Sequence, residues 1–310
     1  MRHKQKALLL GRGYWGEILA RYIQEYYDLL EILGSNVEPS HLYKSLESAD
    51  VAFIATPLHS HFSLAQLALE CNCDVFIEKP TTTTLAQLTT LQSLARKRNR
   101  VLFTNYIYTF SRSIGHALEL LEQTSMQSIH AKICQYGRFY ANESVLEVLG
   151  VHYLSVFAAM EAQGILHNVR VVECEFFDSG LQSARVVLES SECPISLECS
   201  LLAQSKTRIL QIQINNTTAH NQQSSLEDTD STDLTLCVNM LSPTPLTIEP
   251  ISKHKSLSPL PIYDESQNLT LSLDNFTKAI IDKHTYHYHE RLCTLTLKLL
   301  EKAHAKANIA

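Results

Sequence analysis

Short apolar runs alternate with stretches of helical spacing from the start of the chain to about residue 123. The runs typical of buried strands cover residues 7–10, 29–34, 51–55, 75–77 and 101–104. Helical spacing occupies residues 13–27, 62–71 and 85–98, between those runs. Because strands and helices alternate in this order, the pattern predicts βαβ repetition and a doubly wound parallel sheet with helices on both faces.

The pattern changes in the rest of the chain. Longer strand-like runs cover residues 129–140, 167–177, 184–188, 195–202 and 208–214. Helices are predicted at 145–161, 269–282 and 289–307, and the polar stretch 217–232 is predicted to be a mobile loop. This half of the chain therefore predicts an α+β domain with a large, mainly antiparallel open sheet.

The length of 310 residues favours two domains, because single cores stop growing near ~250 residues. We expect residues 1–122 to form the α/β domain and residues 123–310 the α+β domain. The hydrophobic fraction of 45%, the charged fraction of 19% and the net charge of -6 are typical of a soluble globular protein. They give no reason to expect nucleic acid or a membrane as a partner.

The apolar run near the amino terminus covers only residues 7–10, too short for the core of a signal peptide. No later stretch reaches the ~18 uncharged apolar residues of a membrane span, so we expect a cytoplasmic protein. The eight cysteines are scattered singly, apart from Cys71 and Cys73, and the sequence contains no CxxC motif. Reduced, mostly buried thiols are the expected state.

The segment "LLLGRGYWGEILARYI" carries Gly11, Gly13 and Gly16 in the spacing GxGxxG, directly after the first strand and at the opening of a helix. Gly11 permits a tight turn, Gly13 lets the backbone approach a pyrophosphate, and Gly16 lets the helix pack on the strand. The motif predicts dinucleotide binding, with Tyr14 and Trp15 beside the ligand. The alternative is a glycine turn that serves packing alone.

The second strand should end on an acid that bonds the ribose hydroxyls of the adenosine. Ser35 and Asn36 stand near that place, and Glu31 comes too early. Loss of the acid favours a 2′-phosphate, but no arginine follows to hold one. The sequence therefore leaves the cofactor as NAD or NADP, with Ser35 among its predicted contacts.

A third motif ends the run 75–77. Glu78, Lys79 and Pro80 follow it directly, at the carboxyl end of a predicted strand. In open α/β sheets, ligands bind just beyond the carboxyl ends of the strands. Lys79 is therefore a candidate for chemistry, and the alternative is a surface lysine that caps a carboxylate.

Three segments in order resemble the Gfo/Idh/MocA oxidoreductase family: "GRGYWG", "ADVAFIATPLHSHFSLAQLALECNCDVFIEKP" and "NYIYTFSRSIGHALELLE". The resemblance is strong over residues 7–122 and rests on general layout over the rest. Thr56, Pro57 and His61 match the TPxxxH turn that the family places beside the cofactor. Residues 78–80 match its EKP motif, and "NYIYTFSRS" is nearest to members that act on nucleotide-linked sugars.

The resemblance implies a Rossmann domain followed by an α+β domain whose open sheet commonly forms an oligomer interface, so we expect a homo-oligomer, a dimer or a tetramer. It implies that Lys79 bonds the reacting hydroxyl oxygen, while Glu78 and Pro80 fix the turn, usually with a cis bond before the proline. The implied chemistry is hydride transfer between a sugar carbon and nicotinamide, coupled to proton movement at the oxygen.

The family's second catalytic element is an aspartate followed four residues later by a histidine. In "SVLEVLGVHYLSVF" the histidine is His152, and Val148 stands at the aspartate's place. Glu147 would point roughly 100° away on a regular helix. Three hypotheses stay open: His152 acts alone as a general base, an irregular helix start lets Glu147 replace the aspartate, or the site has lost catalysis. A further alternative is a core histidine bonded to a backbone carbonyl.

Tyr106 and Tyr108 follow the last strand of the first half and are predicted to line the substrate pocket, although aromatic residues there also suit a core. Arg112 and Tyr140 are weaker pocket candidates. No metal site is expected at the three histidines of "KHTYHYHER", His284, His287 and His289, because they lie in a predicted interhelical turn without a nearby cysteine or spaced acid.

The main hypothesis is thus an NAD(P)-dependent dehydrogenase or reductase of a sugar, nucleotide sugar or cyclitol, with Lys79 and His152 as catalytic residues. The rival is a dinucleotide-binding protein without turnover that acts as a sensor or scaffold. A third hypothesis is an oxidoreductase of non-sugar substrates, because a fold does not fix the substrate.

Overall fold

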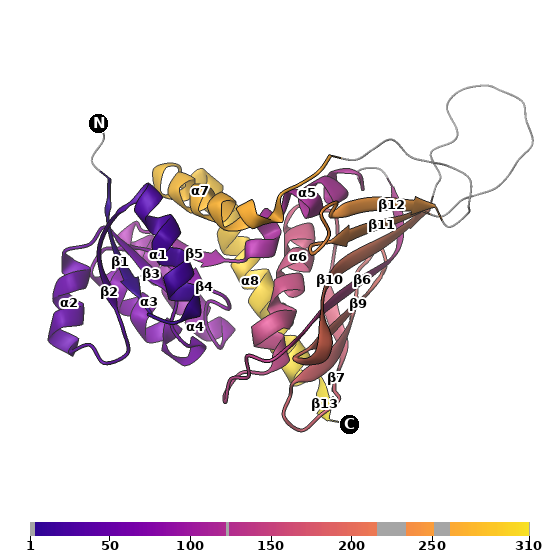
Figure 1. Ribbon diagram of the computed structural model, residues 1–310, viewed down its shortest axis with the longest axis horizontal. Helices are drawn as coiled ribbons and strands as arrows, with labels where there is room; N and C mark the ends of the chain where they lie inside the picture. The colour runs from indigo at the N-terminus through magenta and orange to yellow at the C-terminus, as the bar shows by residue number, and fades with distance from the viewer. Residues whose placement is uncertain (1–3, 122–123, 216–233, 251–260, 310) are drawn as a thin grey trace, which may run out of the picture. The chain divides into compact units, whose positions relative to one another are not determined.

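The computed structural model describes residues 4–121, 124–215, 234–250 and 261–309 (Figure 1). The stretch 217–232, for which a mobile loop was expected, lies outside the described residues. The chain divides into two compact units, Met1–Tyr106 with Leu269–Lys298, and Ile107–Asn268 with Leu299–Ala310. These units differ from the expected 1–122 and 123–310, because 107–122 groups with the second unit and most of the tail groups with the first.

The first unit contains a parallel sheet in the strand order β2-β1-β3-β4-β5. Its strands are β1 (Lys6–Leu10), β2 (Asp28–Leu33), β3 (Val51–Ile54), β4 (Asp74–Glu78) and β5 (Leu102–Asn105). Every residue of β3, β4 and β5 is buried, as expected for strands that helices cover on both faces. The predicted α/β class and parallel sheet are confirmed.

Helices surround this sheet. They are α1 (Tyr14–Tyr26), α2 (Pro39–Glu47), α3 (His61–Glu70), α4 (Leu85–Arg98), α7 (Asn268–Ile281) and α8 (His284–Ala305), of which the last continues into the second unit. Helix α2 was not predicted. It begins at Pro39, whose fixed φ suits the first helical position, and buries only Leu46. Its apolar side chains are Leu42, Tyr43 and Leu46, and this short set was not recognised as helical spacing.

An aromatic row explains why the carboxyl-terminal helix α7 belongs to the first unit. Phe53, Phe76 and Phe103 occupy neighbouring register positions on β3, β4 and β5. The ring of Phe276 on α7 lies 5.8, 5.4 and 5.6 Å from theirs. The Tyr27 hydroxyl is also 2.9 Å from the Thr277 hydroxyl. A helix more than 150 residues away in sequence thus covers one face of the sheet.

The second unit contains an eight-stranded sheet in the order β12-β11-β10-β6-β9-β8-β7-β13. The strands are β6 (Ser125–Tyr136), β7 (Arg170–Phe176), β8 (Ser183–Glu189), β9 (Pro194–Ser200), β10 (Leu202–Asn215), β11 (Leu234–Asn239), β12 (Leu246–Pro250) and β13 (Ala307–Ile309). All neighbours are antiparallel except β6 with β9 and β7 with β13. The predicted α+β unit with a mainly antiparallel sheet is confirmed.

The face of this sheet that is buried carries the helices α5 (Arg112–Glu119) and α6 (Val151–Ala162), with the latter running along the strands in Figure 1. Strand β9 alternates buried and half-exposed residues, as a sheet covered on one face requires. A Cβ atom on Gly150, just before α6, would lie 3.6 Å from the Cys199 sulfur of β9. Gly150 thus brings the helix start close to the sheet.

Several predicted boundaries were wrong. The strand expected at 129–140 ends at Tyr136, because Gly137 and Arg138 take positive φ values of 90° and 61° and turn the chain. Helix α5 and strands β11, β12 and β13 were not predicted. All eight cysteines are free thiols and six are buried, as predicted.

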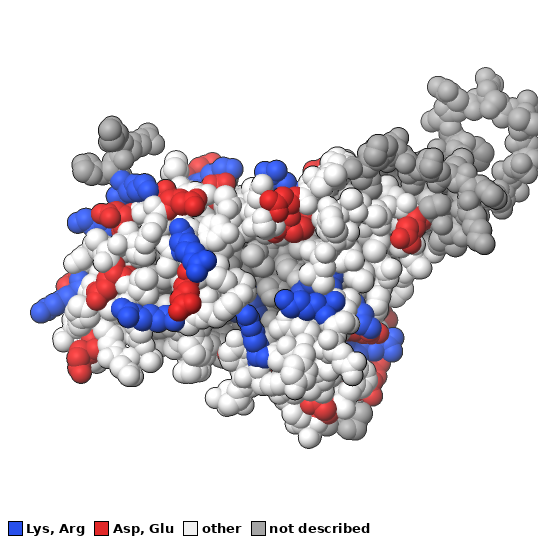
Figure 2. Space-filling model, in the orientation of Figure 1, with Lys and Arg blue, Asp and Glu red and all other residues white. Residues whose placement is uncertain are grey.

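Lysine and arginine side chains are interspersed with acidic ones over the first unit on the face shown in Figure 2. Within the described ranges, the helices are all too short or too polar to cross a bilayer. The expected cytoplasmic location stays a prediction.

Candidate functional site

Two glycines of the loop between β1 and α1 are required by close backbone contacts. Gly11 has a φ of +118°, and a Cβ atom there would lie 2.3 Å from the Ala55 carbonyl oxygen. A Cβ atom on Gly16 would lie 2.1 Å from the Gly11 carbonyl oxygen. Any larger residue at either position would force the loop away from β3 or the helix away from the loop.

Gly13 differs from these two because a Cβ atom there would meet no atom of the described chain within 4 Å. It is also the N-cap residue of α1 and provides no side chain to cap the helix. Backbone amides at a helix start favour an anion, and an open glycine lets a ligand approach them closely. Beside Gly13, Tyr14 is 57% exposed and packs edge to face against Trp15. The loop therefore fits the pyrophosphate of a dinucleotide.

The end of β2 carries Ser35 and Asn36, both exposed. The sequence offered no arginine after this strand, but the structure brings one from the glycine loop. Arg12 donates hydrogen bonds from Nε and Nη2 to the Ile32 carbonyl oxygen, at 3.0 and 2.8 Å. Only the tertiary fold reveals this neighbour, because the direction of an exposed arginine has no local sequence signal.

His61 connects the two turns that follow β3 and β4. Its Nδ1 lies 2.9 Å from the Pro80 carbonyl oxygen and its Nε2 lies 2.9 Å from the Thr56 carbonyl oxygen. Burial lowers the pKa of His61, although both carbonyl oxygens favour its protonated form. The Thr56–Pro57 turn and the turn at Pro80 are thus held together by one buried ring.

The peptide bond between Lys79 and Pro80 is cis, as the family resemblance implied. Lys79 is half-buried directly after β4, and Glu78 is buried at the strand's last position. Glu78 Oε1 accepts a hydrogen bond from Asn105 Nδ2 at 2.9 Å, and Asn105 Oδ1 accepts one from the Ser272 hydroxyl at 2.8 Å. Burial raises the pKa of Glu78, while Asn105 and the charge of Lys79 oppose the rise.

Sequence reasoning missed Asn105 and Ser272. Asn105 stands opposite Glu78 in the register of β4 and β5, so a polar residue closing the last strand was an available signal. Ser272 lies on α7, and nothing near it in sequence points to the EKP turn. The side chain of Glu78, directly before Lys79, is therefore held through Asn105 by a helix that is distant in sequence.

Tyr106 has no exposed surface, and its hydroxyl is 3.5 Å from the Thr81 hydroxyl. Burial raises the pKa of its phenol. This placement favours the core alternative for Tyr106 over a contact with substrate, so Tyr106 is not carried into the proposed site.

In the second unit, two predicted residues come together. The rings of Tyr108 and His152 stack with centroids 4.6 Å apart and an angle of 26° between their planes. Tyr108 also packs edge to face on Tyr153 at 5.4 Å. Burial raises the pKa of Tyr108 to about 12, so its hydroxyl stays protonated at neutral pH. The weaker candidates Arg112, at the start of α5, and Tyr140 are exposed.

The helix start before His152 is irregular, as one hypothesis required. Residues Leu146–Gly150 form a π-helical turn, in which the Val151 N–H bonds the Leu146 carbonyl five residues back. Val148 lies in this turn and is buried. The valine at the aspartate's place is therefore shielded from solvent.

Glu147 in the same turn is held by other partners. One carboxylate oxygen accepts hydrogen bonds from the Ser144 backbone and hydroxyl, at 2.9 and 2.5 Å, and the other lies 2.5 Å from His304 Nε2. Burial would raise the pKa of Glu147, but the bonds from His304 and Ser144 outweigh it and hold that pKa below its usual value. Both oxygens are thus engaged, which counts against Glu147 as a replacement for the missing aspartate.

The interhelical turn predicted around the three histidines is wrong, because α8 begins at His284. His289 is buried, stacks on Phe103 at 3.8 Å and accepts a hydrogen bond from the Thr104 N–H at 2.9 Å. Burial lowers its pKa to about 3, so the ring is a neutral acceptor in the core. In the part of the chain that the structure describes, no cluster of three histidine, cysteine or acidic residues could hold a metal.

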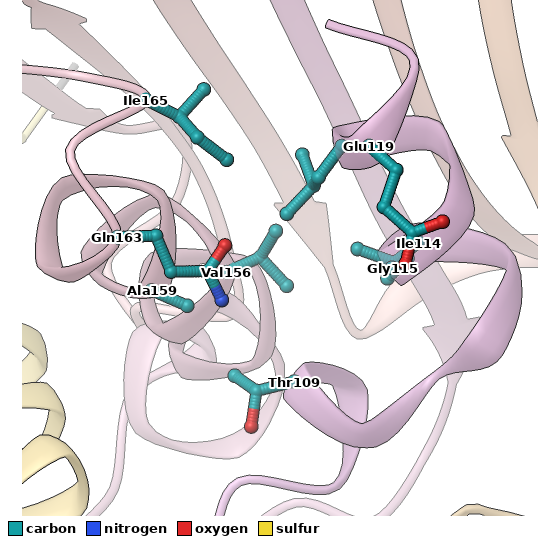
Figure 3. Close-up of a pocket in the computed structure, with 9 residues that line it drawn as sticks. Thr109, Ile114, Gly115, Glu119, Val156, Ala159, Gln163 and Ile165 are labelled. Carbon is teal, nitrogen blue, oxygen red and sulfur yellow. The ribbon is translucent and has the colours of Figure 1, made fainter. Parts of the chain in front are cut away.

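The second unit has a cavity of about 250 Å³. It lies between α5 and α6, as Figure 3 shows. Its lining combines aliphatic side chains with the polar groups of Thr109, Glu119 and Gln163. It contains none of the predicted catalytic residues, and it is smaller than the ~300 Å³ of ordinary ligand pockets.

A parallel α/β unit with a glycine loop at its first strand-to-helix turn defines the class of Rossmann-type nucleotide-binding proteins. Residues 21–106 match the model of the Gfo/Idh/MocA family, an oxidoreductase family with an NAD-binding Rossmann fold. The match confirms, over these residues, the resemblance seen in the motifs.

Two curated oxidoreductases are similar to parts of the chain. The chain is 43% identical over 65 residues to the uncharacterized oxidoreductase YdgJ of Escherichia coli (strain K12), which is 21% of this chain and 18% of that protein. It is 28% identical over 130 residues to an uncharacterized oxidoreductase of Streptococcus pneumoniae serotype 4, which is 37% of this chain and 35% of that protein. The matches thus span well under half of these relatives.

Solved structures extend the likeness of fold to the whole chain. A 3-ketoreductase from Actinomadura kijaniata in complex with NADP and TDP-benzene aligns with a TM-score of 0.71 at 12% identity, over 99% of both chains. A UDP-N-acetylglucosamine 3-dehydrogenase from Acidithiobacillus ferrooxidans aligns with a TM-score of 0.67 at 17% identity, over 98% of this chain and 99% of that one. At these identities the likeness shows a shared fold.

Proposed function

We propose that the protein is an NAD(P)-dependent oxidoreductase that transfers a hydride between nicotinamide and a hydroxyl-bearing carbon. The observation that carries the proposal is the open backbone at Gly13, placed between two glycines that close contacts require. Open space beside the first backbone amides of a helix, at the first βα turn of a parallel sheet, is suited to a pyrophosphate. A glycine turn that served packing alone would not need this space.

In this proposal Lys79 hydrogen-bonds the reacting oxygen and His152 takes up or returns its proton. Bound nicotinamide would accept or supply the hydride. Tyr108 contributes by holding the imidazole of His152 in a stacked position. The turns that carry Thr56 and Pro80 are proposed cofactor contacts, joined by His61. Ser35, Tyr14, Trp15, Pro57 and Glu78 complete that set.

The proposed substrate is a sugar, a nucleotide sugar or a cyclitol. Support comes from two proteins of like fold, one a ketoreductase bound to NADP and TDP-benzene and the other a dehydrogenase of UDP-N-acetylglucosamine. We also propose a homo-oligomer, a dimer or a tetramer, formed through the open sheet of the second unit. Light scattering after size exclusion would measure the subunit number.

The test begins with titration of the protein with NADH and NADPH, followed through nicotinamide fluorescence. An absorbance screen over nucleotide sugars, free sugars and inositols then measures turnover. Lys79→Ala should lower turnover by about 100-fold or more, and dinucleotide affinity should stay within about threefold. Lys97→Ala, which removes an exposed lysine from α4, is the matched control. Failure to bind either dinucleotide would end the proposal.

A second candidate, dinucleotide binding without turnover, is favoured by one observation. Val148 is buried where the family has its aspartate, and both oxygens of Glu147 are engaged by Ser144 and His304. The main proposal stands beside it because a histidine such as His152 can act as a general base near neutral pH without a carboxylate partner. Tight dinucleotide binding with no turnover over the whole screen would support this second candidate instead.

A further inference from the structure

The side chain of Arg12, from the glycine loop, reaches the end of β2, where an adenosine ribose is selected in proteins of this fold. Its Nε and Nη2 both donate to the Ile32 carbonyl oxygen, at 3.0 and 2.8 Å. Its Cδ atom lies 3.7 Å from the position that a Cβ atom would take on Gly34. The side chain is therefore turned back from the glycine loop onto the strand end, and a guanidinium held by two bonds has a defined direction.

The guanidinium is also available to a ligand. Arg12 is exposed, and within the described residues its Nη1 makes no hydrogen bond. A guanidinium offers a planar fork of N–H donors that matches phosphate oxygens. The two Arg12 donors that are bonded to the Ile32 carbonyl oxygen orient the guanidinium, and its remaining N–H groups can bind an anion.

The acid that would repel a phosphate at this place is missing. Ser35 and Asn36 follow the strand, and both are exposed and uncharged. The nearby carboxylate, Glu31, accepts hydrogen bonds from His41 Nε2 at 2.9 Å and from the Ser45 hydroxyl at 3.1 Å. The hydrogen bond from His41 and the charge of Arg12 both lower the pKa of Glu31. The carboxylate of Glu31 is bonded to two side chains of α2.

We propose that Arg12 is the specificity-determining residue for a 2′-phosphate on the adenosine ribose, with the Ser35 hydroxyl as a second donor, so that the protein prefers NADP(H) to NAD(H). This inference depends on the proposed function, because it requires the glycine loop to hold a dinucleotide. The sequence showed no arginine after the second strand to hold such a phosphate, and Arg12 reaches this place from the glycine loop instead.

The experiment measures equilibrium binding rather than turnover. Dissociation constants for NADPH and NADH are determined by nicotinamide fluorescence for the wild type, Arg12→Ala and Arg21→Ala. Arg21 is an exposed arginine further along α1, so its variant loses the same charge away from the loop. Competition by adenosine 2′,5′-bisphosphate and by AMP repeats the comparison on the adenosine half alone.

The wild type should bind NADPH at least about 10-fold more tightly than NADH, and Arg12→Ala should weaken NADPH binding about 10- to 100-fold. NADH affinity should change less than about threefold, and Arg21→Ala should leave both affinities unchanged. Adenosine 2′,5′-bisphosphate should lose its advantage over AMP in the Arg12 variant alone.

Different failures have different meanings. Equal weakening of NADPH and NADH in Arg12→Ala would give Arg12 a purely structural role at the strand end and overturn the inference. A wild type that binds both dinucleotides without discrimination would also overturn it and leave the proposed function standing. A wild type that binds neither would refute the proposed function itself.

Discussion

Replacing Asn105 with alanine tests how the EKP turn is supported. The change removes the donor to the buried Glu78 carboxylate and the acceptor of the Ser272 hydroxyl, two bonds of 2.9 and 2.8 Å. A hydrogen bond to a charged group contributes about 1.5–3 kcal/mol and a neutral one about 0.5–1.5 kcal/mol. At pH 8 we therefore expect Asn105→Ala to lower the free energy of unfolding by about 2–4.5 kcal/mol.

The loss should depend on pH. Burial raises the pKa of Glu78 above its usual 4.5, so the folded state holds its proton over a wider pH range than the unfolded state does. Stability from this group is therefore complete below pH 4.5 and falls as pH rises toward the folded pKa. Removing Asn105 raises that pKa further. The loss in the variant should grow between pH 4 and pH 8, by about 1.4 kcal/mol for each unit of added shift.

The assay is denaturant unfolding at pH 4 and pH 8, followed by tryptophan fluorescence. Trp15 is the only tryptophan of the chain and lies in the first unit, so it reports on this unit alone. Ser272→Ala is the control, with an expected loss of about 1 kcal/mol that is the same at both pH values. Two results would refute the support of Glu78 by Asn105. One is a loss of unfolding free energy in Asn105→Ala below 0.5 kcal/mol, which is about the noise of such measurements. The other is a loss that is equal at both pH values.

Three further predictions follow from the contacts. Gly16→Ala should lower the free energy of unfolding by about 3 kcal/mol or more, because its Cβ would lie 2.1 Å from a backbone oxygen. Gly13→Ala should lower it by about 1 kcal/mol or less and weaken dinucleotide binding. Equal losses for the two variants in the Trp15 unfolding curves would contradict this. Phe276→Ala should cost about 3–5 kcal/mol in the same assay, and a loss under 1 kcal/mol (~a surface value) would contradict the packing of α7 on the sheet. Glu147→Gln should lower the stability of the second unit by about 1.5–3 kcal/mol at pH 7, measured by far-ultraviolet circular dichroism. Because the bonds from His304 and Ser144 hold the pKa of Glu147 below its usual value, this loss should shrink as pH falls through that lowered pKa. A loss that did not shrink with falling pH would refute it.

The sequence by itself determined the strand and helix order of the first half, the glycine loop and the EKP turn. Each of these depends on residues close together in the chain. Buried strands form apolar runs, and Gly11 and Gly16, which close backbone contacts require, stand in the spacing GxGxxG. The same local logic failed for α2, which buries one residue, and for the strand end at Tyr136, where two positive φ values turn the chain.

The tertiary structure decided which side chains support those motifs. Phe276 and Ser272 approach the first sheet from the far end of the chain, His304 binds Glu147, and Arg12 turns back onto β2. Tyr106 and Tyr108 stand two residues apart, yet one is enclosed in the core and the other stacks on His152. Such partners are selected by burial and hydrogen bonding between segments that meet only after folding, so no local pattern encodes them.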